Sequence, residues 1–289
     1  MPRRKILSSR PPGIKLGTCV LRFDRPRVMG IVNNTPDSFS KDGLGGDVRR
    51  AIARGEEMFA DGADVVDVGG ESTRPGAEPV PAEEEMRRVV PVVERLSERH
   101  PGRVSIDTMK PEVAEAALFA GASTVNDVSG LRNQKMIEVV AEHDAAVIIM
   151  HMLGEPRTMQ VSPRYKDVVD DIKKYLWNRV AAAEMTGVSP RKIMVDPGIG
   201  FGKTKEHNLE ILARLGELRS LGKPIVIGVS RKAFIGKITG RPVEERLEGS
   251  IAAATLAVRE GADIVRVHDV KETVQALAVA NAIIGRLRR

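Results

Sequence analysis

The stretch Met29-Gly-Ile-Val-Asn-Asn-Thr-Pro-Asp-Ser-Phe-Ser40 joins a short apolar run to a cluster of polar turn residues. The apolar run, Val28 to Val32, is too short and too rich in β-branched residues for a helix, so it predicts a buried strand. The residues from Asn33 to Asp37 are typical of a turn. A turn that caps the next helix would explain one such segment, but the same pattern recurs along the chain.

Eight units of this kind, a strand followed by a helix, can be recognised from Val28 onward. We predict strands at residues 28–33, 64–68, 104–106, 123–125, 146–150, 193–195, 224–228 and 263–267. We predict helices at about residues 47–61, 82–99, 111–120, 133–143, 167–186, 206–220, 243–260 and 270–287, with an extra short helix after the seventh strand. Regular alternation of strands and helices is typical of a parallel sheet.

Near-identical joints between helix and strand support the repetition of one unit. Residues 61–67, 120–126 and 260–266 each have Gly-Ala at their second and third positions, and the glycine is suited to cap the preceding helix. A count of eight favours an α/β protein with a closed (β/α)8 TIM barrel over an open doubly wound sheet. Leu16 to Phe23 is predicted to be a strand within an N-terminal β-hairpin that plugs one end of the barrel.

The composition fits a single barrel domain at residues 16–289, preceded by a flexible basic tail at residues 1–15. Hydrophobic residues make up 42% of the 289 residues, which is enough for a substantial core. No apolar run approaches the roughly 18 residues of a membrane span and no signal peptide is evident, so we expect a cytoplasmic protein without membrane contact. The single cysteine, Cys19, excludes an internal disulfide and a cysteine-cluster metal site.

The charge of the chain gives little support for a nucleic-acid partner. Lysine and arginine outnumber aspartate and glutamate by 45 to 39, and part of the excess is in the two termini. Solvated tails are the simpler explanation of such ends. Only nine residues are aromatic, so a base-stacking surface is not expected either.

Polar residues follow every predicted strand, and in a barrel all of these ends face the same mouth. Some, such as Asp107 and Ser230, could simply cap the next helix. As a set, carboxylates and amides suit a flat heterocycle rich in N–H groups, and the cations suit an anionic group. The strand-end residues are Asn33, Thr35, Asp37, Asp67, Asp107, Thr108, Asn126, Asp127, His151, Asp196, Ser230, Arg231, Lys232, Arg266, His268 and Asp269.

The glycine-rich loop at residues 198–204 does not match a nucleotide-binding motif. Its spacing misses the phosphate-loop pattern by one residue, because position 197 is proline, and it is not a G-x-G-x-x-G sequence. A P-loop ATPase is therefore not indicated. We interpret the loop as a flexible wall beside a ligand at the barrel mouth.

From about Leu16 to its C-terminus the chain resembles dihydropteroate synthase. The resemblance lies in eight motifs in the same order, at residues 29–40, 67–76, 105–108, 125–127, 150–152, 196–203, 230–232 and 266–270. It implies synthesis of 7,8-dihydropteroate from p-aminobenzoate and 6-hydroxymethyl-7,8-dihydropterin diphosphate in folate biosynthesis, with release of pyrophosphate. It also implies a homodimer, a Mg²⁺ cofactor and a sulfonamide target.

The resemblance also implies which residues form the site. Asp107, Asn126, Asp196 and Lys232 would hold the pterin, Met150 would line its slot, and Arg266 would stack on its face, as a planar guanidinium can. The diphosphate would be bound by Asn33, Arg74, Arg266 and His268, with Mg²⁺ at Asn33. The walls around p-aminobenzoate would be Phe39, Thr73, Pro75, Phe201 and Lys232. Of these, the expected catalytic residues are Asn33, Arg74, Lys232, Arg266 and His268.

The implied chemistry is a dissociative substitution, because diphosphate leaves readily once its charge is neutralised.

The sequence departs from the family pattern at three places. Asn34 replaces a small apolar residue and could alter the first loop, and Lys41-Asp42-Gly43 has its acidic residue one place later than usual. Ala233 lacks the polar group that is expected near the p-aminobenzoate carboxylate. Two alternatives are disfavoured, because the diphosphate-binding cations and every strand-end residue that the reaction requires are present in the sequence. One is a methyltetrahydrofolate-binding barrel of a corrinoid methyltransferase, and the other is a catalytically silent barrel that binds pterin or nucleic acid.

Overall fold

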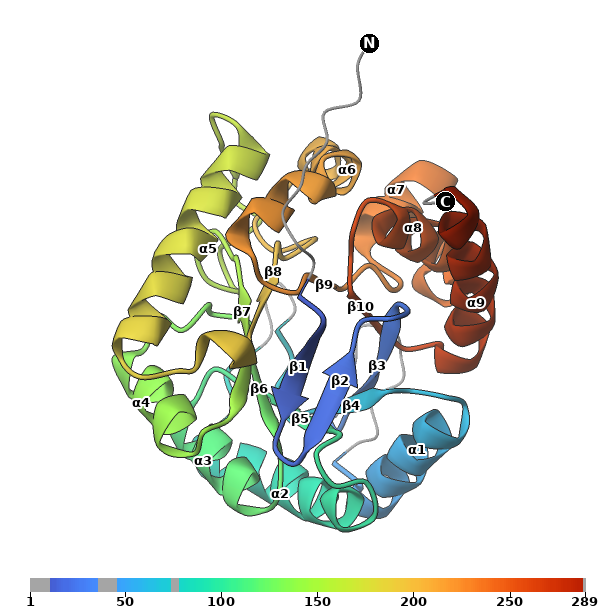
Figure 1. Cartoon of the computed structure of the whole chain (residues 1–289). Helices are drawn as coiled ribbons and strands as arrows, with labels where there is room; N and C mark the ends of the chain where they lie inside the picture. Colours follow the sequence, from blue (N-terminus) through green and yellow to red (C-terminus); the bar gives the residue numbers. More distant parts are fainter. Residues whose placement is uncertain (1–10, 36–45, 74–77, 288–289) are drawn as a thin grey trace.

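The eight predicted strands form one parallel sheet in the computed structural model, which describes residues 11–35, 46–73 and 78–287 (Figure 1). The sheet order is β8-β7-β6-β5-β4-β3-β10-β9. A bridge between Val195 and Ile225 joins its two edges, and the Val195 N–H donates to the Pro224 carbonyl at 2.9 Å. The predicted (β/α)8 barrel is therefore confirmed. Its strands are β3 Arg27–Asn33, β4 Val65–Gly69, β5 Val104–Asp107, β6 Thr124–Asp127, β7 Ala146–Met150, β8 Ile193–Asp196, β9 Val226–Ile227 and β10 Ile264–Val267.

Helices surround the sheet in a ring (Figure 1). They are α1 Val48–Ala60, α2 Ala82–Arg99, α3 Pro111–Phe119, α4 Gln134–Glu142, α5 Val168–Met185, α6 Lys205–Ala213, α7 Ala233–Thr239, α8 Leu247–Arg259 and α9 Val270–Leu287. Two predicted helices are shorter than expected. A 3-10 turn at Leu215–Leu221, which contains Gly216, follows α6, and another at Val243–Glu245 precedes α8. Glycine at position 216 disfavours continuation of the α-helix. None of the helices in the described segments is long and apolar enough to cross a bilayer.

The glycine joints act as predicted. Gly62 has a φ of 101°, its N–H donates to the Phe59 carbonyl at 3.1 Å, and the next N–H, of Ala63, donates to Met58 at 2.9 Å. This pair of hydrogen bonds is the Schellman motif, which requires a left-handed residue that glycine adopts without strain. The helix thus ends abruptly and β4 begins three residues later.

The N-terminal hairpin consists of β1 Gly13–Leu16 and β2 Cys19–Arg22. The prediction of one strand from Leu16 to Phe23 is wrong, because Gly17, with a φ of 53°, turns the chain between the two strands. β1 also includes residues 13–15, which were predicted to belong to the flexible basic tail. Residues 1–10 of that tail lie outside the described part of the chain. Ile14 and Leu16 are buried against the interior of the barrel, which fixes β1 in place and confirms the predicted plug.

The barrel interior has an apolar floor and a polar layer above it. Met29, Val65, Met194 and Ile264 belong to the cluster that packs on the hairpin. Side chains two residues apart on a strand face the same side, so the same strands present Ile31, Asp67, Asp196 and Arg266 in the next layer. Polar groups therefore meet at the carboxyl ends of the strands, above a closed hydrophobic base.

Candidate active site

A cavity of about 410 Å³ opens at the carboxyl ends of the strands. Its lining includes every predicted site residue that the structure describes: Asn33, Thr73, Asp107, Asn126, Met150, Asp196, Phe201, Lys232, Arg266 and His268. The predictions for Phe39, Arg74 and Pro75 concern residues outside the described segments. Ten side chains from distant parts of the sequence thus converge on one cavity.

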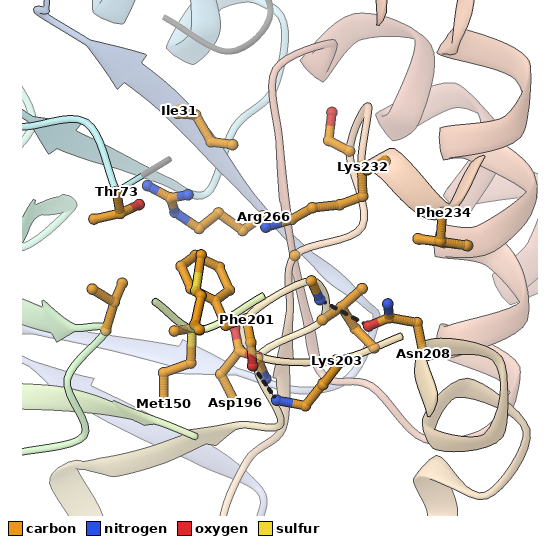
Figure 2. Close-up of a pocket in the computed structure, with 18 of the residues that line it drawn as sticks. Ile31, Thr73, Met150, Asp196, Phe201, Lys203, Asn208, Lys232, Phe234 and Arg266 are labelled. Atoms are coloured by element: carbon orange, nitrogen blue, oxygen red, sulfur yellow. Dashed lines mark hydrogen bonds between the residues drawn. The ribbon is translucent and has the colours of Figure 1, made fainter. Parts of the chain in front are cut away.

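Arg266 extends across the middle of this cavity with its guanidinium end toward Thr73, and Ile31 lies on one side of it and Met150 and Phe201 on the other (Figure 2). Its Nη2 donates to Asp107 Oδ2 at 2.6 Å, and its Nε donates to Asp67 Oδ2 at 2.6 Å. Both bonds are charge-assisted, and together they fix the plane of the guanidinium.

Two carboxyls at the strand ends, those of Asp107 and Asp196, have raised pKa values. Burial raises the pKa of Asp107 to about 7, although the nearby charge of Arg266 opposes the effect. Burial likewise raises the pKa of Asp196 to about 6, against the hydrogen bond that Asp196 Oδ1 accepts from the Gly198 N–H at 2.7 Å. Desolvation disfavours the ionised carboxylate. Both groups therefore change protonation state near neutral pH, as is common at functional sites.

An apolar slot lies beside these carboxyls. Met150 packs with Val128, Met152 and Met159, and Phe201 closes the cluster from the loop after β8. Lys232 Nζ lies 4.4 Å from the centroid of the Phe201 ring, a cation–π distance. Burial lowers the pKa of Lys232 to about 8. Thioether and ring surfaces suit a flat ligand, and the lysine adds a donor at its edge.

Lys203 is a buried residue that also lines the cavity, although its place in the sequence did not mark it as a site residue. Its Nζ lies 3.0 Å from His151 Nδ1 and donates to the carbonyls of Phe201 at 2.9 Å and His151 at 3.3 Å. Burial lowers the pKa of His151 to about 2, so the imidazole is neutral and can accept from the lysine. His151 itself, a strand-end residue, is turned toward Lys203 and does not line the cavity.

The loop after β8 is further fixed by Asn208, whose Oδ1 accepts from the Gly200 N–H at 2.8 Å (Figure 2). Lys203 lines the cavity and also donates to the Phe201 carbonyl of this loop. The loop is a supported wall of the cavity.

On the opposite side, the loop after β9 brings Ser230 to His268, with Ser230 Oγ at 2.9 Å from His268 Nδ1. The neighbouring Arg231 makes two bonds to Asp269, at 2.5 and 3.0 Å, and does not line the cavity. Arg231 and Asp269, although both are strand-end residues, therefore stabilise the loop after β9 and do not line the cavity.

The departure at Asn34 has a structural explanation. Asn34 is fully buried, and its Nδ2 donates to the Arg88 carbonyl on α2 at 2.8 Å. The Arg88 side chain in turn donates to the Gly70 carbonyl at 2.9 Å. Asn34 thus ties the end of β3 to α2. Ala233 lines the cavity, as expected from its place in the sequence.

The described segments contain no group of three or more His, Cys, Asp or Glu side chains able to hold a metal ion. Asn33 and Thr35 both line the cavity and carry oxygen atoms suited to a hard cation. Mg²⁺ commonly keeps several waters and takes further oxygens from substrate phosphates. The donors present therefore fit a Mg²⁺ ion that arrives with a phosphate ligand, and they do not form a complete metal site of their own.

Comparisons with known proteins agree with this geometry. Residues 29–268 match the family model "Pterin binding enzyme". The chain is 44% identical to dihydropteroate synthase of Escherichia coli K12 over 265 residues, which cover 92% of this chain and 94% of the relative. The Yersinia pestis dihydropteroate synthase in complex with a sulfonamide drug has a TM-score of 0.92 and 41% identity, and covers 94% of this chain and 99% of that one. The Burkholderia cenocepacia enzyme complexed with 7,8-dihydropteroate has a TM-score of 0.87 and 46% identity, and covers 97% and 99%.

Proposed function

This chain belongs to the dihydropteroate synthase family, and from this premise we propose how its own residues carry out the reaction. The chain is a transferase of folate biosynthesis that condenses 6-hydroxymethyl-7,8-dihydropterin diphosphate with p-aminobenzoate to give 7,8-dihydropteroate and pyrophosphate. One observation carries the proposal: the carboxylates, amide and cations required by the two substrates line the same cavity.

The pterin binds between the apolar slot and Arg266. Asp196, Asp107 and Asn126 accept hydrogen bonds from its amino and ring N–H groups, and Lys232 donates at the opposite edge. Asp196 is buried and the side chain of Asp107 is only 14% exposed, so each charge-assisted bond to a ring N–H contributes more than it would in water. The planar guanidinium of Arg266 lies against the ring face.

The leaving group is stabilised by the positive charge of Arg266 and by hydrogen-bond donors. Arg266 and His268 line the cavity where the diphosphate would lie, and Asn33 is on the neighbouring strand. The carbon–oxygen bond breaks and its electron pair leaves with pyrophosphate, while the electron-rich pterin delocalises the positive charge on its methylene carbon. The amine of p-aminobenzoate then forms the carbon–nitrogen bond and loses one proton to solvent.

We propose Asn33 as the protein ligand of Mg²⁺, because it lines the cavity at the end of β3. When bound with the diphosphate, the ion would supply positive charge to the departing oxygens. The chain's own residues orient the diphosphate, so loss of Asn33 should weaken diphosphate binding more than binding of a pterin alcohol.

p-Aminobenzoate enters on the outer side of the pterin, between Thr73, Phe201 and Lys232. Its amine must face the pterin methylene, so its carboxylate points toward the mouth. Ala233 offers no hydroxyl there, and Lys232 and backbone groups would hold the carboxylate. We propose this pocket as a sulfonamide target, since the similar Yersinia pestis enzyme binds such a drug.

We further propose a cytoplasmic homodimer. Neighbouring helices α8 and α9 expose large apolar side chains: Leu256 is 57%, Val279 63% and Ile283 59% exposed. Val279 and Ile283 are four residues apart and so share one face of α9, and an exposed apolar face is typical of protein interfaces. Sedimentation of the wild type and of Val279→Glu tests the dimer. The single free cysteine suits a reducing compartment, and cell fractionation tests the location.

Release of pyrophosphate in the presence of both substrates tests the activity. The dissociative step has a separate test, in which the pterin diphosphate carries ¹⁸O in its carbon–oxygen bridge. Reversible cleavage lets the label move to a non-bridging position of recovered substrate when p-aminobenzoate is absent. Retention of all label in the bridge, in enzyme that turns over both substrates, would argue for a concerted displacement.

A further inference from the structure

Asp67 lies directly beneath the cavity without lining it. It is fully buried on β4, in the same interior layer as Arg266 on β10. Its neighbours Asp107, Asn126 and Arg266 all line the cavity, whereas Asp67 does not. Any effect of this carboxylate on a ligand must therefore pass through the residues above it.

One oxygen of Asp67 holds two of those residues. Oδ2 accepts from Arg266 Nε at 2.6 Å and from Asn126 Nδ2 at 2.9 Å. A carboxylate can only accept hydrogen bonds, so the amide nitrogen of Asn126 must face Asp67. The carbonyl oxygen of Asn126 is then the atom that it offers to the cavity.

The same contact orients Arg266. Its guanidinium is held by Asp67 through Nε and by Asp107 through Nη2, both at 2.6 Å. Two carboxylates on adjacent strands, β4 and β5, thus fix the guanidinium plane, and its flat face is presented as a unit.

We propose that Asp67 is a positioning residue for pterin recognition, which sets the amide of Asn126 as a hydrogen-bond acceptor and fixes the plane of Arg266. This inference rests on the proposed function of the cavity. An acceptor at Asn126 matches a ligand edge that carries N–H groups. Loss of Asp67 would allow the amide to rotate and present its NH₂ group, which such a ligand edge repels.

Asparagine and alanine at position 67 should differ in their effect on Asn126 and Arg266. Ser105 on the adjacent strand β5 is in register with Asp67, and its buried hydroxyl has no hydrogen-bond partner among the described residues. In Asp67→Asn the new NH₂ could donate to this hydroxyl and leave a carbonyl oxygen facing Asn126 and Arg266. Asp67→Ala removes the acceptor altogether.

A matched control is available at the other end of the same strand. Asp64 is also buried and bound to arginine, with Arg25 Nη2 at 2.6 Å and Arg27 Nη1 at 3.0 Å, but it lies at the base of the barrel. Asp64→Ala should lower the melting temperature and leave the affinity for 6-hydroxymethyl-7,8-dihydropterin unchanged. Asp67→Ala should lower that affinity by at least about tenfold, the loss of one charge-assisted hydrogen bond.

A second variant, Asn126→Asp, gives a readout that a purely structural role would not change. When protonated, the new carboxyl can donate to Asp67 and still present its carbonyl oxygen, as asparagine does. When ionised, it faces the Asp67 carboxylate and loses this arrangement. Pterin affinity, divided by that of the wild type at each pH, should therefore fall as the pH rises. The other charged groups facing the pair are Arg266, Asp107, Asp196 and Lys232, and the division by wild type removes their own titration.

Calorimetric titration of the dihydropterin into these variants between pH 6 and 8.5 is the test. The fall of relative affinity with pH should be present in Asn126→Asp and absent in Asp67→Ala/Asn126→Asp. Wild-type affinity in Asp67→Ala would overturn the proposal. If Asp67→Ala does not fold, the proposal is still overturned when the relative pterin affinity of Asn126→Asp does not change with pH. Pyrophosphate release by the wild type is measured in parallel, so that failure of the proposed function is seen separately.

Discussion

Arg266 Nη2 donates to Asp107 Oδ2 at 2.6 Å, so two side chains expected to contact the pterin also bind one another. The positive charge of Arg266 favours the ionised form of Asp107 against the desolvation that raises its pKa. The hydrogen bond also means that a pterin N–H must share Asp107 with the arginine. Recognition of the pterin is thus coupled to the protonation of this carboxyl.

Pterin binding should weaken as the pH falls through 7 and then 6. Burial raises the pKa of Asp107 to about 7 and of Asp196 to about 6, and only the ionised forms accept two hydrogen bonds. The ligand favours the ionised form, so it lowers both pKa values, and binding between pH 6 and 7 should release protons. Calorimetry in two buffers of different ionisation enthalpy measures this release. Heats that do not depend on the buffer would contradict it.

Arg266→Lys should reduce turnover by at least about tenfold, although it keeps the charge. An ammonium cannot hold Asp67 and Asp107 in one plane or stack on a ring, and each charge-assisted bond lost contributes about 1.5–3 kcal/mol. Arg241→Lys is the control, because Arg241 pairs with Glu245 on the surface at 3.0 Å. Full activity in Arg266→Lys would show that positive charge alone suffices.

Asp196→Asn should weaken pterin binding by about tenfold or more and leave the fold intact. The amide oxygen can still accept from the Gly198 N–H, so the loop after β8 keeps its anchor. The amide cannot accept two bonds from the pterin, and each charge-assisted bond is worth about 1.5–3 kcal/mol. Calorimetric titration with the dihydropterin measures the affinity, and a thermal melt checks that the fold is intact. A variant with unchanged affinity would remove Asp196 from the site.

Lys203→Met should weaken p-aminobenzoate binding through Phe201. The lysine satisfies the buried carbonyls of His151 and Phe201, and each acceptor left without a partner costs about 1–3 kcal/mol. Lys192→Met is the matched control. Lys192 is also buried, but it precedes β8 at the base of the barrel, where it binds Asp144. Both variants should melt earlier, and only Lys203→Met should raise the KM for p-aminobenzoate. Equal KM values in the two would leave Lys203 a purely structural role.

Much of this architecture could be predicted from the sequence because it repeats locally. The Gly-Ala joints and apolar runs mark each unit, and Asp107, Asn126 and Asp196 stand out as polar residues at the ends of buried strands. The turn at Gly17 was missed because Leu16 to Phe23 alternates as one strand would. The roles of Asp67, His151 and Lys203 depend on contacts between strands far apart in sequence. Local pattern marks such residues as polar but does not say which of them face the cavity.

The proposed activity is tested most directly by turnover of the purified wild-type chain with 6-hydroxymethyl-7,8-dihydropterin diphosphate, p-aminobenzoate and Mg²⁺. Pyrophosphate release and 7,8-dihydropteroate, identified by mass, are followed together. The two products should appear in equal amounts, both should require p-aminobenzoate, and a sulfonamide should suppress them. Folded enzyme that binds the pterin but forms no dihydropteroate would contradict the proposed activity.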